Sequence, residues 1–228
     1  MDLLAASISF FGNLIFRLLE KIPGIKFCQI LKGPDDLQFL LIPKCGTRSL
    51  RNAVLKYHDN PVTAKWRAWS YIHYTTKIDG KTPYVVILRP PLERIHSCWK
   101  QKVSAERSGT IFYFWQYYPI IRPDMDFGEF LSAVAKIPAP LREKHFISLK
   151  YLINGADINL CQFVPLASLE SKLHNWFGIV VASANKTTKT EISDVNARIF
   201  EQILGADYAL DTQLYQKAVV TSGHTELL

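Results

Sequence analysis

The sequence predicts an α/β fold of three layers, in which helices cover both faces of a central parallel sheet. Two apolar runs, at residues 37–42 and 84–88, have the length and continuous hydrophobicity of strands buried on both faces. Each run is followed by a short turn and an amphipathic helix, and such strand–turn–helix units favour a parallel sheet. The composition agrees, because a chain of 228 residues with 48% hydrophobic and 21% charged residues can bury a substantial core.

Residues 1–30 are predicted to form an apolar, amphipathic helical segment ahead of an α/β domain at 31–228. Residues 3–16 are mostly apolar, and Arg17 follows them. The charge of Asp2 and the lack of a small-residue cleavage site argue against a secretory signal, and the run is shorter than the ~20 residues of a spanning helix. Two interpretations remain open: a helix packed on the domain, or an interfacial helix in peripheral contact with a membrane.

The other elements follow in chain order. The first strand leads through a turn into a helix at 49–56, and the second leads into a helix at 92–102. The aromatic block at 111–118 is interpreted as core or as the wall of a substrate groove, because basic residues do not interleave with its rings. A third strand is predicted at 160–164 and further helices at 127–137, 166–177, 193–204 and 210–220, with Ser193 as a cap and Gly178 and Gly205 as helix ends.

The first candidate site is the loop between strand 37–42 and its helix. A tight turn at a helix N-terminus exposes backbone N–H groups, which together with the helix dipole favour an anion. Gly46 allows close backbone approach, Thr47 and Ser49 offer hydroxyl donors, and Lys44 and Arg48 add positive charge. The loop is not a Walker A motif, because its lysine precedes the glycine. The alternative is a basic turn in which Ser49 only caps the helix.

The second candidate site follows strand 84–88. Arg89 lies at the carboxyl end of that strand, where ligands of α/β folds bind, and Ser97 follows two turns into the next helix. A guanidinium fork and a hydroxyl can hold one phosphate from two sides. The alternative is that Arg89 pairs with a carboxylate and that Ser97 is only a small helix residue.

Together the two loops resemble the motifs of the PAPS-dependent sulfotransferases, most closely those of the Golgi-type and bacterial carbohydrate sulfotransferase branch. In that family P-K-x-G-[ST]-[ST]-[SW] holds the 5′-phosphosulfate of the donor, and R-[DN]-P-x-x-R-x-x-S holds its 3′-phosphate. This chain offers residues 43–49 for the first motif and, in register for the second, Arg89, Pro91, Arg94 and Ser97. The resemblance spans residues 37–216 and implies a P-loop-like fold. It also implies transfer of a sulfuryl group from 3′-phosphoadenosine 5′-phosphosulfate (PAPS) to a carbohydrate hydroxyl.

The resemblance implies donor-binding roles for residues of both loops. The residues concerned are Lys44, Cys45, Gly46, Thr47, Arg48, Ser49, Arg89 and Ser97. Lys44 would bind the bridging oxygen of the phosphosulfate, while Arg89 and Ser97 would hold the 3′-phosphate. The rest of the first loop would hold the 5′-phosphate through its amides and side chains. Two positions depart from the family pattern, since Pro90 stands where Asp or Asn is usual and Arg48 replaces a small hydroxyl residue.

Lys44 and His73 are the predicted catalytic residues. Lys44 would stabilise the charge that grows on the leaving oxygen. Members of the family take the proton of the acceptor hydroxyl with a histidine or carboxylate that lies between the two phosphate motifs. The candidates there are His58, Asp59, His73 and Asp79. His73 is favoured because it is closer to the second strand and lies among aromatic residues, whereas His145 and His174 are interpreted as structural; the alternative for His73 is an ordinary half-buried histidine.

Charge and cysteine content set the expected partners and compartment. The chain has 27 basic and 20 acidic residues, a net charge of +7 and a pI near 9.2, which favours anionic ligands. The basic residues are spread along the chain, so the expected partner is a carbohydrate acceptor and not a nucleic acid. Four cysteines without a CxxC pair predict free thiols, no metal site and a reducing compartment. The expected location is therefore the cytoplasm, with or without membrane association, or the Golgi lumen for a eukaryotic member of the branch.

One alternative function stays open beside the sulfotransferase. The departure at Pro90 and the apolar N-terminus also fit a non-catalytic, adenosine-phosphate-binding or membrane-associated scaffold of the same fold. An ATP-dependent kinase is disfavoured, because the Walker lysine position and an evident magnesium carboxylate are missing. The sequence predicts neither the sulfated position of the acceptor nor the oligomeric state.

Overall fold

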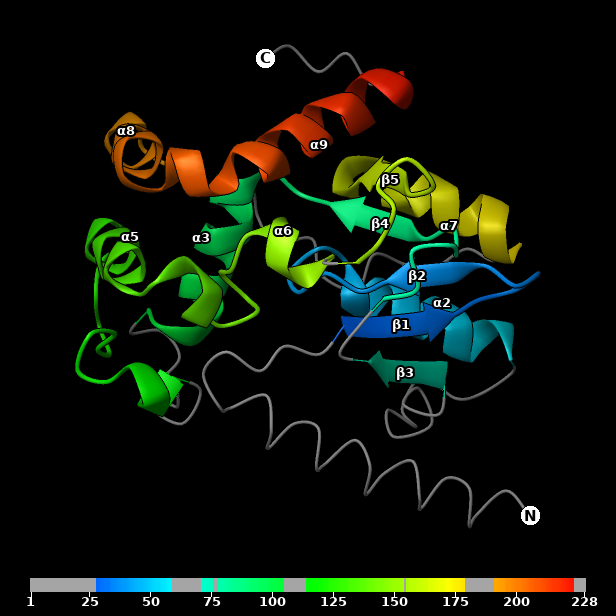
Figure 1. Ribbon diagram of the computed structural model, residues 1–228, viewed down its shortest axis with the longest axis horizontal. Coiled ribbons are helices and arrows are strands. Elements are labelled where there is room, and N and C mark those ends of the chain that lie inside the picture. The colour runs from blue at the N-terminus through cyan, green and yellow to red at the C-terminus, as the bar shows by residue number, and fades with distance from the viewer. Residues whose placement is uncertain are drawn as a thin grey trace.

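The computed structural model describes residues 28–58, 71–75, 78–104, 114–153, 155–178 and 191–223. These residues form a mixed α/β fold on a five-stranded sheet with the strand order β3-β1-β2-β4-β5 (Figure 1). The strands are β1 (Cys28–Lys32), β2 (Gln38–Leu40), β3 (Ile72–Thr75), β4 (Val85–Leu88) and β5 (Gln162–Pro165). The predicted α/β class is confirmed.

The sheet is mixed, so the prediction of a wholly parallel sheet is wrong. β2, β4 and β5 are parallel neighbours, and they are the three strands that the apolar runs predict. β1 pairs antiparallel with both β2 and β3, and the sequence pattern predicts neither β1 nor β3. Both strands are short and carry polar residues, Gln29 in β1 and His73 in β3, which interrupt the apolar pattern. β1 also takes residues 28–30 of the expected N-terminal segment, whose residues 1–27 lie outside the described residues.

The predicted helices are present, with small changes at their ends. The structure contains α2 (Thr47–Tyr57), α3 (Pro91–Lys102), α5 (Phe127–Lys136), α6 (Leu149–Leu152), α7 (Leu169–Phe177), α8 (Asp194–Leu204) and α9 (Ala209–Thr221). Short 3₁₀ turns are η3 (Trp115–Tyr117), η4 (Ala139–Leu141), η5 (Leu166–Ser168) and η6 (Gly205–Tyr208).

Helix capping follows the sequence at three positions and departs from it at one. The Ser193 hydroxyl accepts a hydrogen bond from the backbone of Asn196 at the start of α8, and Gly178 ends α7 with φ of +64°. Ser49 does not cap α2, because that helix already begins at Thr47 with Gly46 as its N-cap. Gly205 is the C-cap residue that ends α8, as predicted, although its φ of −52° is right-handed, and it also opens η6.

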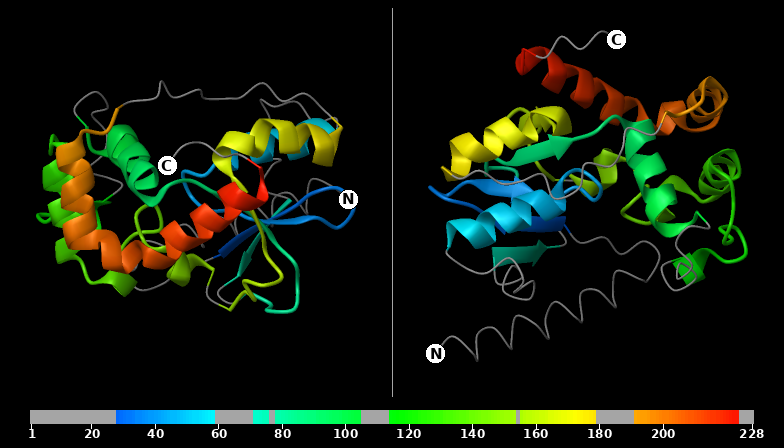
Figure 2. Two further views of the ribbon diagram at one scale, coloured as in Figure 1. Left: turned by 90° about the horizontal axis from the view of Figure 1, so that it is seen from above. Right: turned by 180° about the vertical axis from the view of Figure 1, so that it is seen from behind.

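Helices cover both faces of the sheet. On one face Phe39 of β2 packs against α7, with ring centroids 5.2 Å from Trp176 and 5.8 Å from Phe177. Neighbouring strand residues point to opposite faces, and on the other face the Cys28 thiol donates to the Leu152 carbonyl of α6 at 3.1 Å. Figure 2 shows α2 and α7 together on one side of the sheet and α9 on the other.

A second buried cluster lies beyond the carboxyl ends of β2 and β4, where α3, α5 and α8 gather (Figure 1). Its centre is aromatic, with Phe130 and Phe146 fully buried. Helix α9 ties this cluster to the sheet, because Asp211 of α9 forms an ion pair of 3.1 Å with the buried Arg94 of α3. Arg94 therefore has a structural role, although it occupies a position of the second sequence motif.

Part of the aromatic block belongs to this second cluster. Phe114 and Tyr117 are buried, as the core interpretation predicts, whereas Tyr118 is 65% exposed. Residues 111–113 of the block lie outside the described residues. Among the helices that the structure describes, none combines the length and hydrophobicity needed to cross a bilayer.

Candidate functional site

The loop from Pro43 to Gly46 turns the chain from β2 into α2 with two left-handed residues. Lys44 has φ of +71° and Gly46 has φ of +73°, and the Gly46 carbonyl accepts the Leu50 amide in the first turn of the helix. A Cβ at Gly46 would lie 2.5 Å from Leu169 Cδ2 and 2.9 Å from Leu166 Cδ1. Glycine is thus required here both by the backbone conformation and by the close approach of α7. The first amides of a helix have no partners within the helix itself, so the start of α2 is suited to an anion.

The two predicted phosphate loops lie side by side. β2 and β4 are parallel neighbours in the sheet, so their carboxyl ends meet at the same edge. Across this edge the Arg89 Nη1 donates to the Lys44 carbonyl oxygen at 3.5 Å. The structure therefore brings together Lys44 and Arg89, which are 45 residues apart in the chain.

One face of α3 lines the space beside both loops. Glu93, Ser97 and Gln101 follow one another at intervals of four residues and so share a face of the helix. Glu93 Oε2 lies 3.5 Å from Arg89 Nε, and Gln101 Oε1 accepts a hydrogen bond of 2.7 Å from Lys44 Nζ. Ser97, which is half-buried, lies between these two contacts along the helix. Arg89 therefore pairs with a carboxylate, as one alternative predicts, while its role in holding a phosphate stays a prediction.

The predicted site is strongly cationic. Burial lowers the pKa of the Lys44 ammonium to about 8, and the positive charges of Lys102, Arg89 and Arg48 add to this effect, against a smaller opposing influence of Cys98. The Arg89 Nε is buried and makes no hydrogen bond within the described residues, because its approach to Glu93 is an ion pair only. An anionic ligand would offset the mutual repulsion of these cations and supply acceptors for their N–H groups.

The remaining residues of the first loop differ in exposure. Arg48 is exposed, and Thr47 and Ser49 are half-buried in the first turn of α2. The Cys45 side chain is 1% exposed and belongs to the sheet core, and burial raises the pKa of its thiol to about 11. Cys45 and Gly46 can therefore serve a ligand through their backbone, as the resemblance implies, and not through a thiolate.

His73 lies in the outermost strand of the sheet and is exposed. Its register partner is Ile30 of β1, which in turn faces Leu40 of β2, so the His73 and Leu40 backbones are two strand spacings, about 10 Å, apart. None of the hydrogen bonds or ion pairs described above links His73 to the two phosphate loops. Its assignment as the general base stays a prediction.

The other predicted base candidates lie away from the loops or outside the described residues. His58 follows the last turn of α2, about 16 Å along the helix from its N-terminus, and stacks on Tyr71 at 4.5 Å. Asp79 is exposed in a turn, where it accepts hydrogen bonds from Lys81 and Thr82. Asp59 lies outside the described residues.

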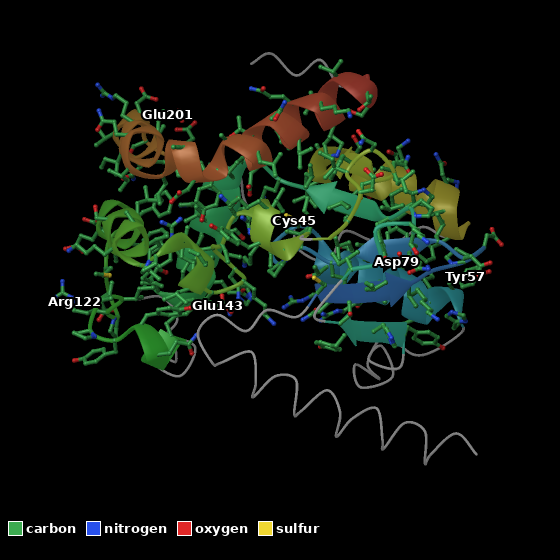
Figure 3. All side chains as sticks on the ribbon, in the orientation of Figure 1. Cys45, Tyr57, Asp79, Arg122, Glu143 and Glu201 are labelled. Atoms are coloured by element: carbon green, nitrogen blue, oxygen red, sulfur yellow. The ribbon has the colours of Figure 1, made fainter. Side chains whose placement is uncertain are left out.

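Three polar side chains near the loops are not among the site residues that the sequence predicts. Gln101 holds the Lys44 ammonium, and a neutral amide on a helix has no motif that would single it out. Glu143 and His145 lie in the segment between η4 and α6 and contact one another at 2.6 Å between Oε2 and Nδ1. Figure 3 shows Glu143 and Cys45 in the central part of the molecule, whereas Tyr57 and Asp79 lie toward the far end of the sheet.

Comparison with known proteins adds no relative. No protein-family model, no curated protein and no solved structure matches this chain. Within the residues that the structure describes, His, Cys, Asp and Glu form no group of three suited to a metal ion. The function considered next therefore rests on the two strand-end loops and the face of α3 beside them.

Proposed function

We propose that the protein is a PAPS-dependent sulfotransferase that transfers a sulfuryl group to a hydroxyl of a carbohydrate acceptor, on a P-loop-like fold. The observation that carries the proposal is the contact of Arg89 with the backbone of Lys44 at the ends of two neighbouring parallel strands. Both residues occupy corresponding positions in the two motifs that resemble those of the family. Their proximity allows one bisphosphorylated adenosine to reach both loops.

In the proposed reaction the two loops would bind different groups of the donor. The first loop and the N-terminus of α2 would hold the 5′-phosphosulfate with backbone amides and hydroxyls. Arg89 would hold the 3′-phosphate by charge-assisted hydrogen bonds, with Ser97 as a second donor one turn beyond Glu93. During transfer the acceptor oxygen forms a bond to sulfur while the bond from sulfur to the bridging phosphate oxygen breaks. Lys44 would stabilise the charge that develops on that oxygen, and a base would take the acceptor proton.

The acceptor and the location follow from the branch that the motifs resemble. A carbohydrate acceptor suits a basic protein that acts on acidic glycans, as in polysaccharide biosynthesis. A cytoplasmic location, with or without membrane association, suits four cysteines that are all free thiols in the structure. A Golgi location would apply to a eukaryotic member.

A thermal-shift comparison of adenosine 3′,5′-bisphosphate with ATP tests the donor class. At a hundredfold excess over its dissociation constant a ligand stabilises the folded protein by about 2.7 kcal/mol, which raises the Tm of a domain of this size by about 5–10 °C. We expect this response to the bisphosphate and a much smaller one to ATP. Equal responses, or a response to ATP alone, would overturn the proposal. Selective bisphosphate binding without transfer to any acceptor would favour the non-catalytic scaffold.

A further inference from the structure

A pair formed by the buried Glu143 and the half-buried His145 lies beside Lys102, at the end of α3. Glu143 is 6% exposed, and its Oε1 and Oε2 lie 2.8 and 2.6 Å from the His145 Nδ1. Glu143 Oε2 also accepts the backbone N–H of His145 at 2.7 Å, which fixes the carboxylate over the ring. The Lys102 Nζ approaches the same ring nitrogen at 3.4 Å. These contacts give the imidazole a single orientation.

The pair belongs to the same part of the molecule as the candidate donor site. Lys102 directly follows Gln101, the residue that holds the Lys44 ammonium, and its charge contributes to the lowered pKa of Lys44. On the other side, Lys144 and Pro43 line the same small cavity, so the loop that carries His145 lies against the first phosphate loop. Through Lys102 and Lys144, the loop that carries His145 thus borders both α3 and the first phosphate loop.

The position of the Glu143 carboxylate indicates which nitrogen of the His145 ring can accept a proton. An ionised Glu143 can only accept hydrogen bonds, so the Nδ1–H of a neutral His145 donates to it and the Nε2 carries the free lone pair. Burial opposes the ionisation of Glu143, yet His145, Lys102 and Lys144 hold the pKa of its carboxyl well below the usual range. Burial also lowers the pKa of His145 to about 4, against the opposing effect of Glu143. At neutral pH the ring is therefore uncharged, so its Nε2 can accept a hydrogen bond from an acceptor hydroxyl.

We propose that His145 is the general base of the reaction, and that Glu143 is the positioning residue that orients it. The assignment rests on the proposed sulfotransferase function. As the acceptor oxygen bonds to sulfur, its proton moves to the His145 Nε2, and the broken bond leaves its electron pair on the bridging phosphate oxygen near Lys44. A histidine held by a buried carboxylate is the arrangement that proton abstraction from a hydroxyl requires. His73, in contrast, is exposed at the sheet edge.

The test compares His145→Gln and Glu143→Gln with two matched controls on α7, His174→Gln and Glu170→Gln, both at exposed positions. His73→Gln is measured in parallel. Each full-length variant is assayed for binding of adenosine 3′,5′-bisphosphate and for transfer from sulfur-labelled PAPS to desulfated glycosaminoglycan oligosaccharides and to water. We expect bisphosphate affinity within about twofold of wild type throughout, and a fall in transfer of about 10²–10⁴-fold for His145→Gln. Glu143→Gln should lower the turnover number at least tenfold without raising the KM for PAPS, and the controls should transfer normally.

The outcomes separate this assignment from the function on which it rests. A wild-type protein that does not bind the bisphosphate overturns the sulfotransferase proposal itself. If the wild type binds the bisphosphate, normal transfer by His145→Gln, or transfer by no form of the protein, overturns the base assignment. Glu143→Gln keeps the size and the backbone hydrogen bond of the side chain, so it carries the test if His145→Gln does not fold. A loss of transfer in His73→Gln alone would return the role to His73.

Discussion

Arg89 is the residue whose place in the structure bears most directly on donor recognition. Its guanidinium lies between the Lys44 carbonyl and Glu93, and its buried Nε makes no hydrogen bond to the described residues. Arg89→Ala should weaken the binding of adenosine 3′,5′-bisphosphate by about 10- to 150-fold, since a hydrogen bond to a charged group is worth about 1.5–3 kcal/mol. Isothermal titration calorimetry measures the loss. Arg198→Ala on the exposed side of α8 is the control, and equal affinities of the two variants would contradict the assignment.

Lys44 predicts a dependence of donor binding on pH. Its pKa is lowered from 10.5 to about 8, mainly by burial, so the ammonium loses its proton as the pH rises through about 8. Anion affinity should therefore be highest below pH 8 and fall progressively between pH 8 and 10. In Lys44→Arg the guanidinium keeps its charge over this range, and the fall should disappear. Titrations with adenosine 3′,5′-bisphosphate at a series of pH values measure this dependence. The same fall in affinity in the wild type and in Lys44→Arg would mean that a group other than Lys44 titrates.

At the scale of single residues, the sequence predicts the site cations Lys44 and Arg89 but not the nearby pair Glu143 and His145. Lys44 and Arg89 each follow a buried apolar strand, so their meeting at one sheet edge follows from parallel pairing. Glu143 and His145 lie in a segment without helical or strand periodicity, and His145 meets Lys102 across 43 residues of chain. Such a contact depends on tertiary packing. The sequence therefore interprets His145 as structural and favours His73, which is closer to the second strand and lies among aromatic residues.

The turn from β2 into α2 is the element on which the first loop depends. In Gly46→Ala the left-handed backbone costs about 1–2 kcal/mol, and collision with the leucines of α7 and η5 adds about 1–3 kcal/mol. Gly178→Ala is the matched control, because Gly178 has φ of +64° but nothing within 4 Å of the added methyl group. Urea unfolding should show a free energy of unfolding that is clearly lower in Gly46→Ala than in Gly178→Ala. Equal losses of unfolding free energy in the two variants would mean that the leucines of α7 and η5 move aside for the added methyl group at no measurable cost.

The strands show why some elements are predictable and others are not. All four residues of β4 are buried, and a strand buried on both faces appears in the sequence as an uninterrupted apolar run. β3 has one buried and one exposed residue among its first two, and β1 ends on an exposed lysine. Partly exposed strands of four or five residues are hard to tell from loops. The antiparallel half of the sheet was missed for this reason.

At the scale of the molecule, the described residues form two buried clusters with the candidate site between them. The first loop belongs to the sheet cluster, whereas Ile95 and Cys98 on the inner side of α3 belong to the helical cluster. A bisphosphate bound to Lys44, Arg89 and Ser97 would hold both clusters at once. We expect it to slow amide hydrogen exchange at residues 44–50 and 93–101 together, while α8 exchanges as before. Protection of only one of the two segments in an exchange experiment would contradict a shared ligand.

The ion pair between Arg94 and Asp211 has a consequence for biosynthesis. The partners are 117 residues apart, so both phosphate loops leave the ribosome long before the carboxylate that anchors α3 has been translated. Until then the nascent chain carries a charged guanidinium with no carboxylate to neutralise it in the folded interior. The buried docking of α3 is therefore completed only after α9 has been synthesised, and the growing polypeptide should gain its full affinity for the proposed nucleotide once α9 has left the ribosome.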